Sequence, residues 1–215
     1  MHDIDKYLDL YFHKGLSYVQ KEKFINYYET LIEYNNHTNL TSITDPLDVV
    51  IKHFYDSIWF MNLIEELNDS PKLLDLGSGA GFPGIPIKIM NDNIQLDALD
   101  SIKKKTNFLE YLKSTLDINY NVINKRAEEH LKECKKEYDI IIFRAVGKLT
   151  PLLKICKDMI RSNGIIIALK SQNVNEEIDH FKKTKESKSL TIEVIHSGQL
   201  PEDKGMRNVV VFRKR

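Results

Sequence analysis

After residue 70, short apolar runs alternate with stretches in which apolar residues recur at helical spacing. The runs that predict buried strands are residues 72–76, 94–100, 118–124, 138–145 and 164–170. The helical patterns that separate or follow them are residues 84–91, 102–116, 126–135, 148–161 and 174–185. Strand and helix alternation at this spacing predicts an α/β fold with a parallel sheet and helices on both faces.

The C-terminal end departs from this alternation. Two strand-like runs, residues 190–198 and 207–214, follow one another with only the turn-rich segment QLPEDKGM between them. They predict an antiparallel hairpin at the edge of the sheet, which then has seven strands and is mostly parallel. This outline is that of the Rossmann-like class I methyltransferases, although a mixed sheet edge is also common in other folds.

Before residue 70 the pattern is helical. Ser17 and Gln20 form a Ser-x-x-Gln capping box at the start of a helix, whose aromatic stripe at residues 24–28 is expected in the core. Asp45, as N-cap, and Pro46, at the first helical position, predict a second helix over DPLDVVIKHFYDSIWFMNLIEEL.

The loop-like stretch NDSPK, near residue 70, predicts a division of the chain. We expect an N-terminal helical extension, residues 1–70, and an α/β domain, residues 71–215, packed together as one unit. A chain of 215 residues is long enough for one α/β domain with such an added piece. Nothing in the sequence demands more than a monomer.

Composition narrows the classes of function. The chain has no run of 18 apolar residues and no apolar core of a signal peptide near its start, so we expect a cytoplasmic protein without a membrane span. The 31 basic and 31 acidic residues cancel, which argues against a non-specific nucleic-acid coat protein. Cys134 and Cys156 and the seven histidines show no metal-ligand spacing, so no metal site is expected.

Residues 72–89, KLLDLGSGAGFPGIPIKI, place four glycines between a predicted strand and a predicted helix. Read from Gly79, the stretch is G-x-G-x-x-G, the dinucleotide fingerprint; read from Asp75, it is D-x-G-x-G-x-G, the turn of S-adenosylmethionine (SAM) binders. In both cases glycine lets the backbone approach a ligand. Pro83 and Pro86 lack the N–H donors that a pyrophosphate would need, and this favours SAM.

Acidic residues near the turn fit the same cofactor. Asp100 ends the second strand, where a carboxylate accepts ribose hydroxyl hydrogen bonds in both NAD and SAM sites, or supplies the N-terminal charge of the next helix. Asp75 favours SAM, because an acid at this place can face the methionine amine directly or through water. Ala127 and Glu128 follow the third strand, where backbone groups would lie beside the adenine.

Eight segments of the chain match one protein family in order and cover nearly its whole length. The segments are YNNHTNLTSITDP (34–46), HFYDSI (53–58), LLDLGSGAGFPGIPIKI (73–89), LDSIKKKTNFL (99–109), RAEE (126–129), RAVGKL (144–149), ALKS (168–171) and RNVVVFRK (207–214). The pair NLTSITDP and HFYDS, upstream of GxGFPGIP, is the most specific. With these segments the chain resembles the bacterial 16S ribosomal RNA guanine-N7 methyltransferases, once called glucose-inhibited division protein B.

The resemblance implies a SAM-dependent enzyme that methylates N7 of one guanine in a hairpin loop of 16S rRNA near the decoding site. Its partner would be 16S rRNA, within the small ribosomal subunit or an assembly intermediate; naked rRNA also stays open, although the neutral net charge favours a shaped ribonucleoprotein. By matching positions, the family's SAM contacts fall on Gly77, Phe82, Asp100, Ser101, Ile102, Ala127, Glu128 and Arg144, while Gly79 and Gly81 shape the turn.

Guanine N7 carries a lone pair and no proton, so its methylation needs no general base. We therefore expect no catalytic acid or base, and only residues that position the two reactants in line. Candidates for holding the guanine lie at the carboxyl ends of strands: Arg144 after the fourth strand and Lys170 after the fifth. Lys170 also fits as an ordinary solvated lysine.

Further substrate-positioning candidates come from outside the glycine motif. His53 and Asp56 are three residues apart on a predicted helix and could form a hydrogen-bonded pair at the mouth of the site, or a structural pair that fixes the extension. Asn39 fits a substrate contact or a loop cap. Arg207, at the start of the last strand, is a candidate for RNA phosphate, and residues 103–105, three lysines, are weaker ones.

Two other functions compete with this interpretation. The first is a SAM enzyme that acts on a protein or a small molecule, which differs in where a labelled methyl group goes. The second is a non-catalytic regulatory module that binds a nucleotide such as NAD as a redox sensor. Pro83 and Pro86 argue against the second, and a comparison of SAM and NADH binding would separate the two cofactors.

Overall fold

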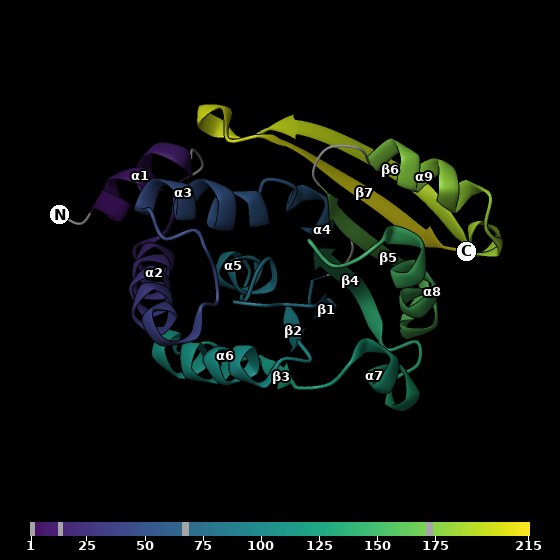
Figure 1. Cartoon of the computed structure of the whole chain (residues 1–215), viewed down its shortest axis with the longest axis horizontal. Coiled ribbons are helices and arrows are strands. Elements are labelled where there is room, and N and C mark those ends of the chain that lie inside the picture. The colour runs from purple at the N-terminus through teal and green to yellow at the C-terminus, as the bar shows by residue number, and fades with distance from the viewer. Residues whose placement is uncertain (1–2, 13–14, 66–68, 171–173) are drawn as a thin grey trace.

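The protein is described here by a computed structural model that covers residues 3–12, 15–65, 69–170 and 174–215. Its middle layer is a seven-stranded sheet in the order β3-β2-β1-β4-β5-β7-β6 (Figure 1). The strands are β1 (Lys72–Leu76), β2 (Gln95–Leu99), β3 (Asn121–Ile123), β4 (Tyr138–Arg144), β5 (Ile160–Lys170), β6 (Leu190–Gln199) and β7 (Met206–Lys214). The first five are parallel, and β7 pairs antiparallel with both β5 and β6, which confirms the predicted sheet and its edge hairpin.

Helices cover both faces of the sheet (Figure 1). One core cluster joins the sheet to α1, α2, α5 and α6, and the other joins it to α7, α8 and α9. The α-helices are α1 (Asp3–Tyr11), α2 (Tyr18–Thr38), α3 (Pro46–Val49), α4 (Asn62–Glu65), α5 (Gly84–Met90), α6 (Lys103–Leu116), α7 (Ala127–Glu133), α8 (Leu149–Met159) and α9 (Val174–Lys182). The result is the three-layer α/β/α arrangement that strand–helix alternation predicts.

Two strand boundaries differ from the sequence prediction by more than one residue. β3 begins at Asn121 rather than at residue 118, because Ile118 and Tyr120 are buried as loop residues, with the Tyr120 hydroxyl donating to the Leu109 carbonyl of α6. β5 begins at Ile160, directly after α8, so the predicted helix ends two residues early. In both places a buried apolar residue lies outside the element that its sequence pattern predicts.

The second N-terminal helix is not continuous, and this prediction was wrong. Its start is as expected, with Asp45 as N-cap and Pro46 at the first helical position. After α3, however, the chain forms a π-helix at Val50–Phe54 and a 3-10 turn at Tyr55–Ser57 before α4. The last two residues of the predicted helix, 66 and 67, lie outside the described residues. Most of this segment is apolar and buried on several sides. The spacing of its apolar residues therefore does not show where the backbone hydrogen-bond pattern changes.

The helix α2 packs against the beginning of the sheet domain. Its N-terminus has the predicted capping box, in which Ser17 and Gln20 exchange side chain-to-backbone hydrogen bonds. Phe24 and Tyr27 are fully buried, as expected for the aromatic stripe. Tyr27 donates its hydroxyl to the Ala80 carbonyl at 2.6 Å, so α2 bonds directly to the glycine-rich turn.

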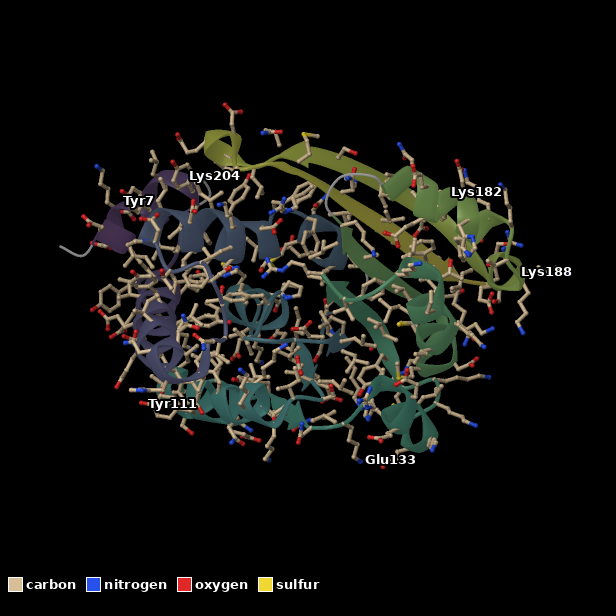
Figure 2. All side chains as sticks on the ribbon, viewed as in Figure 1. Tyr7, Tyr111, Glu133, Lys182, Lys188 and Lys204 are labelled. Carbon is tan, nitrogen blue, oxygen red and sulfur yellow. The ribbon has the colours of Figure 1, made fainter. Side chains whose placement is uncertain are left out.

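Charged side chains extend from the periphery of the molecule. Glu133, Lys182 and Lys188 extend outward from peripheral elements in Figure 2, and all three are exposed. Cys134 and Cys156 are buried and not bridged. Among the helices of the described ranges, none combines the length and the apolar character that crossing a membrane requires.

Candidate functional site

A cavity of about 590 Å³ opens at the carboxyl ends of β1, β2 and β4. This is the edge at which open α/β sheets bind their ligands. Nine of the predicted cofactor residues line it: Gly77, Gly79, Phe82, Asp100, Ser101, Ile102, Ala127, Glu128 and Arg144. The fold therefore brings together residues from four separate parts of the sequence.

The glycine turn between β1 and α5 forms one wall of this cavity. Gly77, Gly79 and Gly81 all have positive φ angles, which side chains rarely adopt. At Gly81 a Cβ atom would also lie 2.5 Å from the Tyr27 hydroxyl. At Gly84 a Cβ atom would lie 2.7 Å from the Asp75 carboxylate, so glycine here allows α5 to approach β1 closely.

Asp75 lies beneath the turn and not among the residues that line the cavity. Its Oδ2 accepts hydrogen bonds from the Ser78 hydroxyl at 2.6 Å and from the Gly84 N–H at 2.9 Å. Burial raises the pKa of Asp75 to about 6, and these two hydrogen bonds oppose that rise. We therefore correct the expectation for Asp75: the geometry makes it a brace for the turn, as it makes Gly81 a packing position against Tyr27.

Asp100 is 5% exposed and bonds both the glycine turn and the start of α6. Its carboxylate accepts the N–H of Gly79 at 3.0 Å and the N–H of Ile102 at 2.9 Å, and Lys105 lies 3.4 Å away. The bond to Ile102, the N-cap of α6, is the helix-start role that the sequence left open. Since a carboxylate has about four acceptor positions, Asp100 also keeps capacity for ligand hydroxyls.

The cavity wall next to Asp100 is more exposed. Ile102 is 44% exposed although it is apolar, and Ser101 and Glu128 are exposed beside it. Ala127 begins α7 and is half-buried. An apolar side chain next to exposed polar groups fits the flat, partly polar face of a nucleoside, as the family contacts imply.

Phe82 lies at the centre of a stack of rings and charges. His53 stacks on it with ring centroids 4.4 Å apart, Tyr27 stacks at 5.2 Å, and the Arg144 guanidinium lies 5.2 Å from the ring centre. Burial, and after it the positive charge of Arg144, lower the pKa of His53 to about 3. His53 is therefore neutral at neutral pH.

Hydrogen bonds around His53 determine its tautomer. An Arg144 Nη2 lies 3.4 Å from Nδ1, and a guanidinium has only donors, so Nδ1 accepts. The proton then sits on Nε2, which donates to the Thr41 hydroxyl at 3.0 Å. His53 is thus a fixed acceptor for Arg144.

Asp56 and His53 both bond Arg144 rather than each other, which corrects the predicted pair. The Asp56 carboxylate, 3% exposed, lies 3.2 Å from Arg144 Nη1 and 3.0 Å from Arg207 Nε. The Lys52 carbonyl, in the π-helix, accepts a second bond from Arg144 Nη1 at 3.0 Å. Burial lowers the pKa of Arg144, and Asp56 opposes that effect. Residues 52–56 therefore hold two arginines that belong to different strands, Arg144 of β4 and Arg207 of β7.

A second cavity, of about 290 Å³, adjoins the first. The two share Arg144, Ala145 and Gly147 in their walls. The smaller one is completed by Leu169, Lys170, Glu177 and Arg207. Lys170 is not a free surface lysine, because it bonds the Gly147 carbonyl and the Glu177 carboxylate, each at 3.1 Å. Three predicted substrate residues, Arg144, Lys170 and Arg207, thus line one cavity.

Asn39 and the lysines of α6 do not line the smaller cavity, although Lys105 lines the larger one. Asn39 is the left-handed C-cap of α2, and its neighbours Leu40 and Thr41, not Asn39 itself, line the larger cavity. The loop-cap role therefore accounts for Asn39. Lys104 bonds the Thr38 carbonyl, and Lys105 pairs with Asp100, so both lysines have partners within the protein.

Sequence reasoning missed several residues at the site, among them Tyr27 and Glu177. Tyr27 was expected only as core, yet its hydroxyl reaches the glycine turn. Glu177 was not singled out at all, although it lines the smaller cavity. The only signal for Glu177 was an acidic residue in a predicted helix after the fifth strand, a pattern too common to identify a site.

The start of α5 decides between the two readings of the glycine motif. A pyrophosphate needs free N–H groups there, but Pro83 and Pro86 have none. The Gly84 N–H is bonded to Asp75, and the Ile85 N–H is bonded to the Gly81 carbonyl at 2.8 Å. The site therefore fits SAM, which has no phosphate, better than a dinucleotide.

Comparison of sequences finds close similarity to one family. The model of the rRNA small subunit methyltransferase G family matches residues 20–206. The Ribosomal RNA small subunit methyltransferase G of Bacillus licheniformis is 38% identical over 204 residues, which cover 94% of this chain and 85% of that protein. The protein of the same name from Bacillus subtilis is 38% identical over 203 residues, covering 93% and 84%.

Comparison of structures finds the same fold at low sequence identity. TYW2 of M. jannaschii, solved in complex with AdoMet, superposes with a TM-score of 0.53 at 17% identity, over 73% of this chain and 77% of that one. Spermidine synthase from Thermotoga maritima gives a TM-score of 0.58 at 18% identity, over 77% and 61%. These likenesses concern the fold.

Proposed function

Because the chain belongs to the rRNA small subunit methyltransferase G family, we propose that it transfers the methyl group of SAM to N7 of one guanine in 16S rRNA. Family membership makes it a SAM-dependent rRNA methyltransferase. The atom and the position are our proposal. The observation that carries it is the pair of adjoining cavities that share Arg144.

We assign the larger cavity to SAM. Asp100 would accept ribose hydroxyls, the chain at Ala127 and Glu128 would border the adenine, and the turn at Gly77 would hold the methionine part. When bound, SAM supplies a methyl group on a sulfonium, which is already an activated leaving group. What the protein adds is position and exclusion of water.

We assign the smaller cavity to the guanine. Guanine O6 accepts hydrogen bonds, and Arg144, Lys170 and Arg207 are the cations at this cavity. Arg144 uses three of its five N–H donors on Lys52, Asp56 and His53, so two donors have no partner among the described residues. Arg144 is thus held in place while it keeps donors for a base.

No residue needs to remove a proton in this reaction. N7 attacks through a lone pair, and the neutral His53, with its lowered pKa, acts as an acceptor for Arg144 rather than as an acid. Asp56 orients Arg144 and Arg207 together. We therefore propose in-line transfer without a general base, with His53, Asp56 and the three cations as positioning groups.

We propose the following context for the reaction. Residues 1–70 form a helical extension that supplies His53 and Asp56, and residues 71–215 form the SAM-binding domain. The target is a decoding-region hairpin loop of 16S rRNA within the small subunit or an assembly intermediate. A monomer acting in the cytoplasm, where ribosomal subunits are assembled, agrees with this substrate.

The test is a methyl-transfer assay with labelled SAM on small ribosomal subunits that lack the modification, followed by nucleoside analysis. Label in 7-methylguanosine from 16S rRNA is the expected result. Label in another nucleoside, or in protein, would contradict the proposed atom or substrate.

Arg144→Ala provides a second test of the same proposal. We expect the rate of methyl transfer to fall about a hundredfold or more, because the substitution removes a charged side chain that lines both cavities. Arg161→Ala, which removes an exposed arginine that pairs with Asp139 on the same sheet, is the matched control. Full activity of Arg144→Ala would exclude an essential role.

A further inference from the structure

The smaller cavity is lined by the Glu177 carboxylate, which has no role in the reaction proposed above. Glu177, on α9, accepts the Leu149 N–H at 2.6 Å and the Lys170 ammonium at 3.1 Å, both with Oε2. Across residues 3–12, 15–65, 69–170 and 174–215, no donor bonds its Oε1. The side chain is 34% exposed and lines the cavity. One oxygen is therefore anchored while the other keeps its acceptor capacity.

The size and place of the cavity suit a single base. Its volume of about 290 Å³ equals that of about ten water molecules at ~30 Å³ each, which is large enough to admit one purine base. Because it shares Arg144, Ala145 and Gly147 with the larger cavity, a base bound here would border the proposed SAM site.

We propose that Glu177 selects guanine by accepting hydrogen bonds from its N1–H and its exocyclic amino group. The inference rests on the proposed function. Among the four RNA bases, only guanine presents two adjacent donors on its Watson–Crick edge, and a carboxylate is an acceptor without donors. That edge belongs to the six-membered ring, whereas N7 belongs to the five-membered ring. Glu177 can therefore hold the base without covering the atom that is methylated.

The same contact gains strength during the reaction. Methylation at N7 places a positive charge on the purine, which makes N1–H and the amino group better donors. The bonds to the Glu177 carboxylate are then stronger in the transition state than in the bound substrate, and such a difference lowers the barrier. Loss of the carboxylate should therefore reduce kcat more than it raises KM.

A purely structural role for Glu177 makes a different prediction. Its bond to the Leu149 N–H ties α9 to the start of α8. If that were its whole role, Glu177→Gln, which keeps an oxygen acceptor, would change activity equally on every substrate.

The experiment compares guanosine and inosine at the target position. Inosine lacks the amino group but keeps N7, O6 and N1–H. Small subunits carrying either nucleoside would be methylated by the wild type, by Glu177→Gln and by Glu176→Gln, the exposed neighbour that serves as matched control. Binding of both subunits in the presence of S-adenosylhomocysteine provides a readout that does not depend on turnover.

We expect the wild type and Glu176→Gln to prefer guanosine by about ten- to a hundredfold in kcat/KM, the size of a hydrogen bond to a charged group. In Glu177→Gln the preference should fall close to one, with the larger loss in kcat. Equal rates of the wild type on both substrates would overturn the inference even if the variant failed to fold. An unchanged preference in a folded Glu177→Gln would overturn it as well.

Failure of the inference is distinguishable from failure of the proposed function. Methylation of the guanosine-containing subunits by the wild type tests the proposed function and does not depend on the role of Glu177. If it yields 7-methylguanosine and Glu177 makes no difference, the function stands and the role of Glu177 is rejected. If it yields none, both are rejected.

Discussion

Buried charges and rings decide how the site residues are oriented. Asp56 and the neutral His53 together hold Arg144 over Phe82, and each of them has little contact with water. A hydrogen bond in such surroundings has few competitors, so the Arg144 donors have fixed directions. The sequence predicted that these residues matter but not how they pair.

Asp100→Ala should weaken SAM binding. The substitution removes the acceptor proposed for the ribose and also the bonds to the Gly79 and Ile102 N–H groups. We expect the Kd of SAM, measured by titration calorimetry, to rise by about ten- to a hundredfold. Asp179→Ala, at an exposed position on α9, is the control. Unchanged affinity in Asp100→Ala would rule out the ribose role.

His53 should make stability depend on pH. Its pKa is about 3 in the folded protein against 6.5 ordinarily, so between these values only the unfolded chain binds the proton. The free energy of unfolding then falls as the pH falls through this window. Between pH 7.5 and 5 the loss from this residue is about 2 kcal/mol, from ~1.4 kcal/mol per pKa unit.

His53→Gln removes this titration. Urea unfolding at the two pH values measures the change in the free energy of unfolding. From the higher to the lower pH, this free energy should fall by about 2 kcal/mol less in the variant than in the wild type, at ~1.4 kcal/mol per pKa unit. His180→Gln, at an exposed position, controls for loss of a histidine. An equal loss in His53→Gln and the wild type would show that His53 is not buried in its neutral form.

At the scale of elements, the glycine turn is held from two sides. Asp75 of β1 bonds Ser78 and the Gly84 N–H from below, and Tyr27 of α2 bonds the Ala80 carbonyl from the other side. A turn made of residues with positive φ has little stability of its own, because glycine loses much conformational freedom on folding. The neighbouring elements therefore determine its shape.

Tyr27→Phe tests this coupling between α2 and the turn. Loss of the hydroxyl leaves the buried Ala80 carbonyl without its donor, which should lower the free energy of unfolding by about 1–3 kcal/mol. The affinity for SAM should fall as well, since the turn lines the larger cavity. Tyr28→Phe is the matched control, because that hydroxyl makes only a 3.4 Å contact with the Thr44 carbonyl. Equal SAM affinity in the two variants would contradict the coupling.

At the scale of the whole molecule, the sheet places two cavities at one edge and leaves the charges balanced. The 31 basic and 31 acidic residues supply no bulk attraction to RNA. Many of the cations near the site already have acidic partners, as Lys105 has in Asp100 and Lys170 in Glu177. Recognition of the target must therefore depend on shape and on a few local contacts.

The preferred substrate should for this reason be a ribonucleoprotein. We expect kcat/KM to be at least about tenfold higher on small subunits, or on an assembly intermediate, than on naked 16S rRNA at physiological salt, where purely electrostatic binding is weak. Rates measured on both substrates over a range of salt concentrations test this. Equal rates on naked rRNA would contradict it.

The alternation of apolar runs was sufficient to predict the sheet and its antiparallel edge. The glycine motif, together with the family resemblance, predicted nine of the residues that line the larger cavity. These features depend on local pattern and on the rule that parallel strands end at one edge. The pattern did not predict the π-helix at Val50–Phe54, because burial on several sides removes the periodicity that distinguishes helix types.

Only the tertiary structure decided the partners of the polar groups. Asp56 lies 88 residues from Arg144 and 151 from Arg207 in the chain, and no local signal connects them. The brace at Asp75, the hydroxyl of Tyr27 and the carboxylate of Glu177 likewise acquire their roles through contacts between distant segments. Periodicity and motifs report which element a residue belongs to, whereas side-chain pairing depends on how the elements pack.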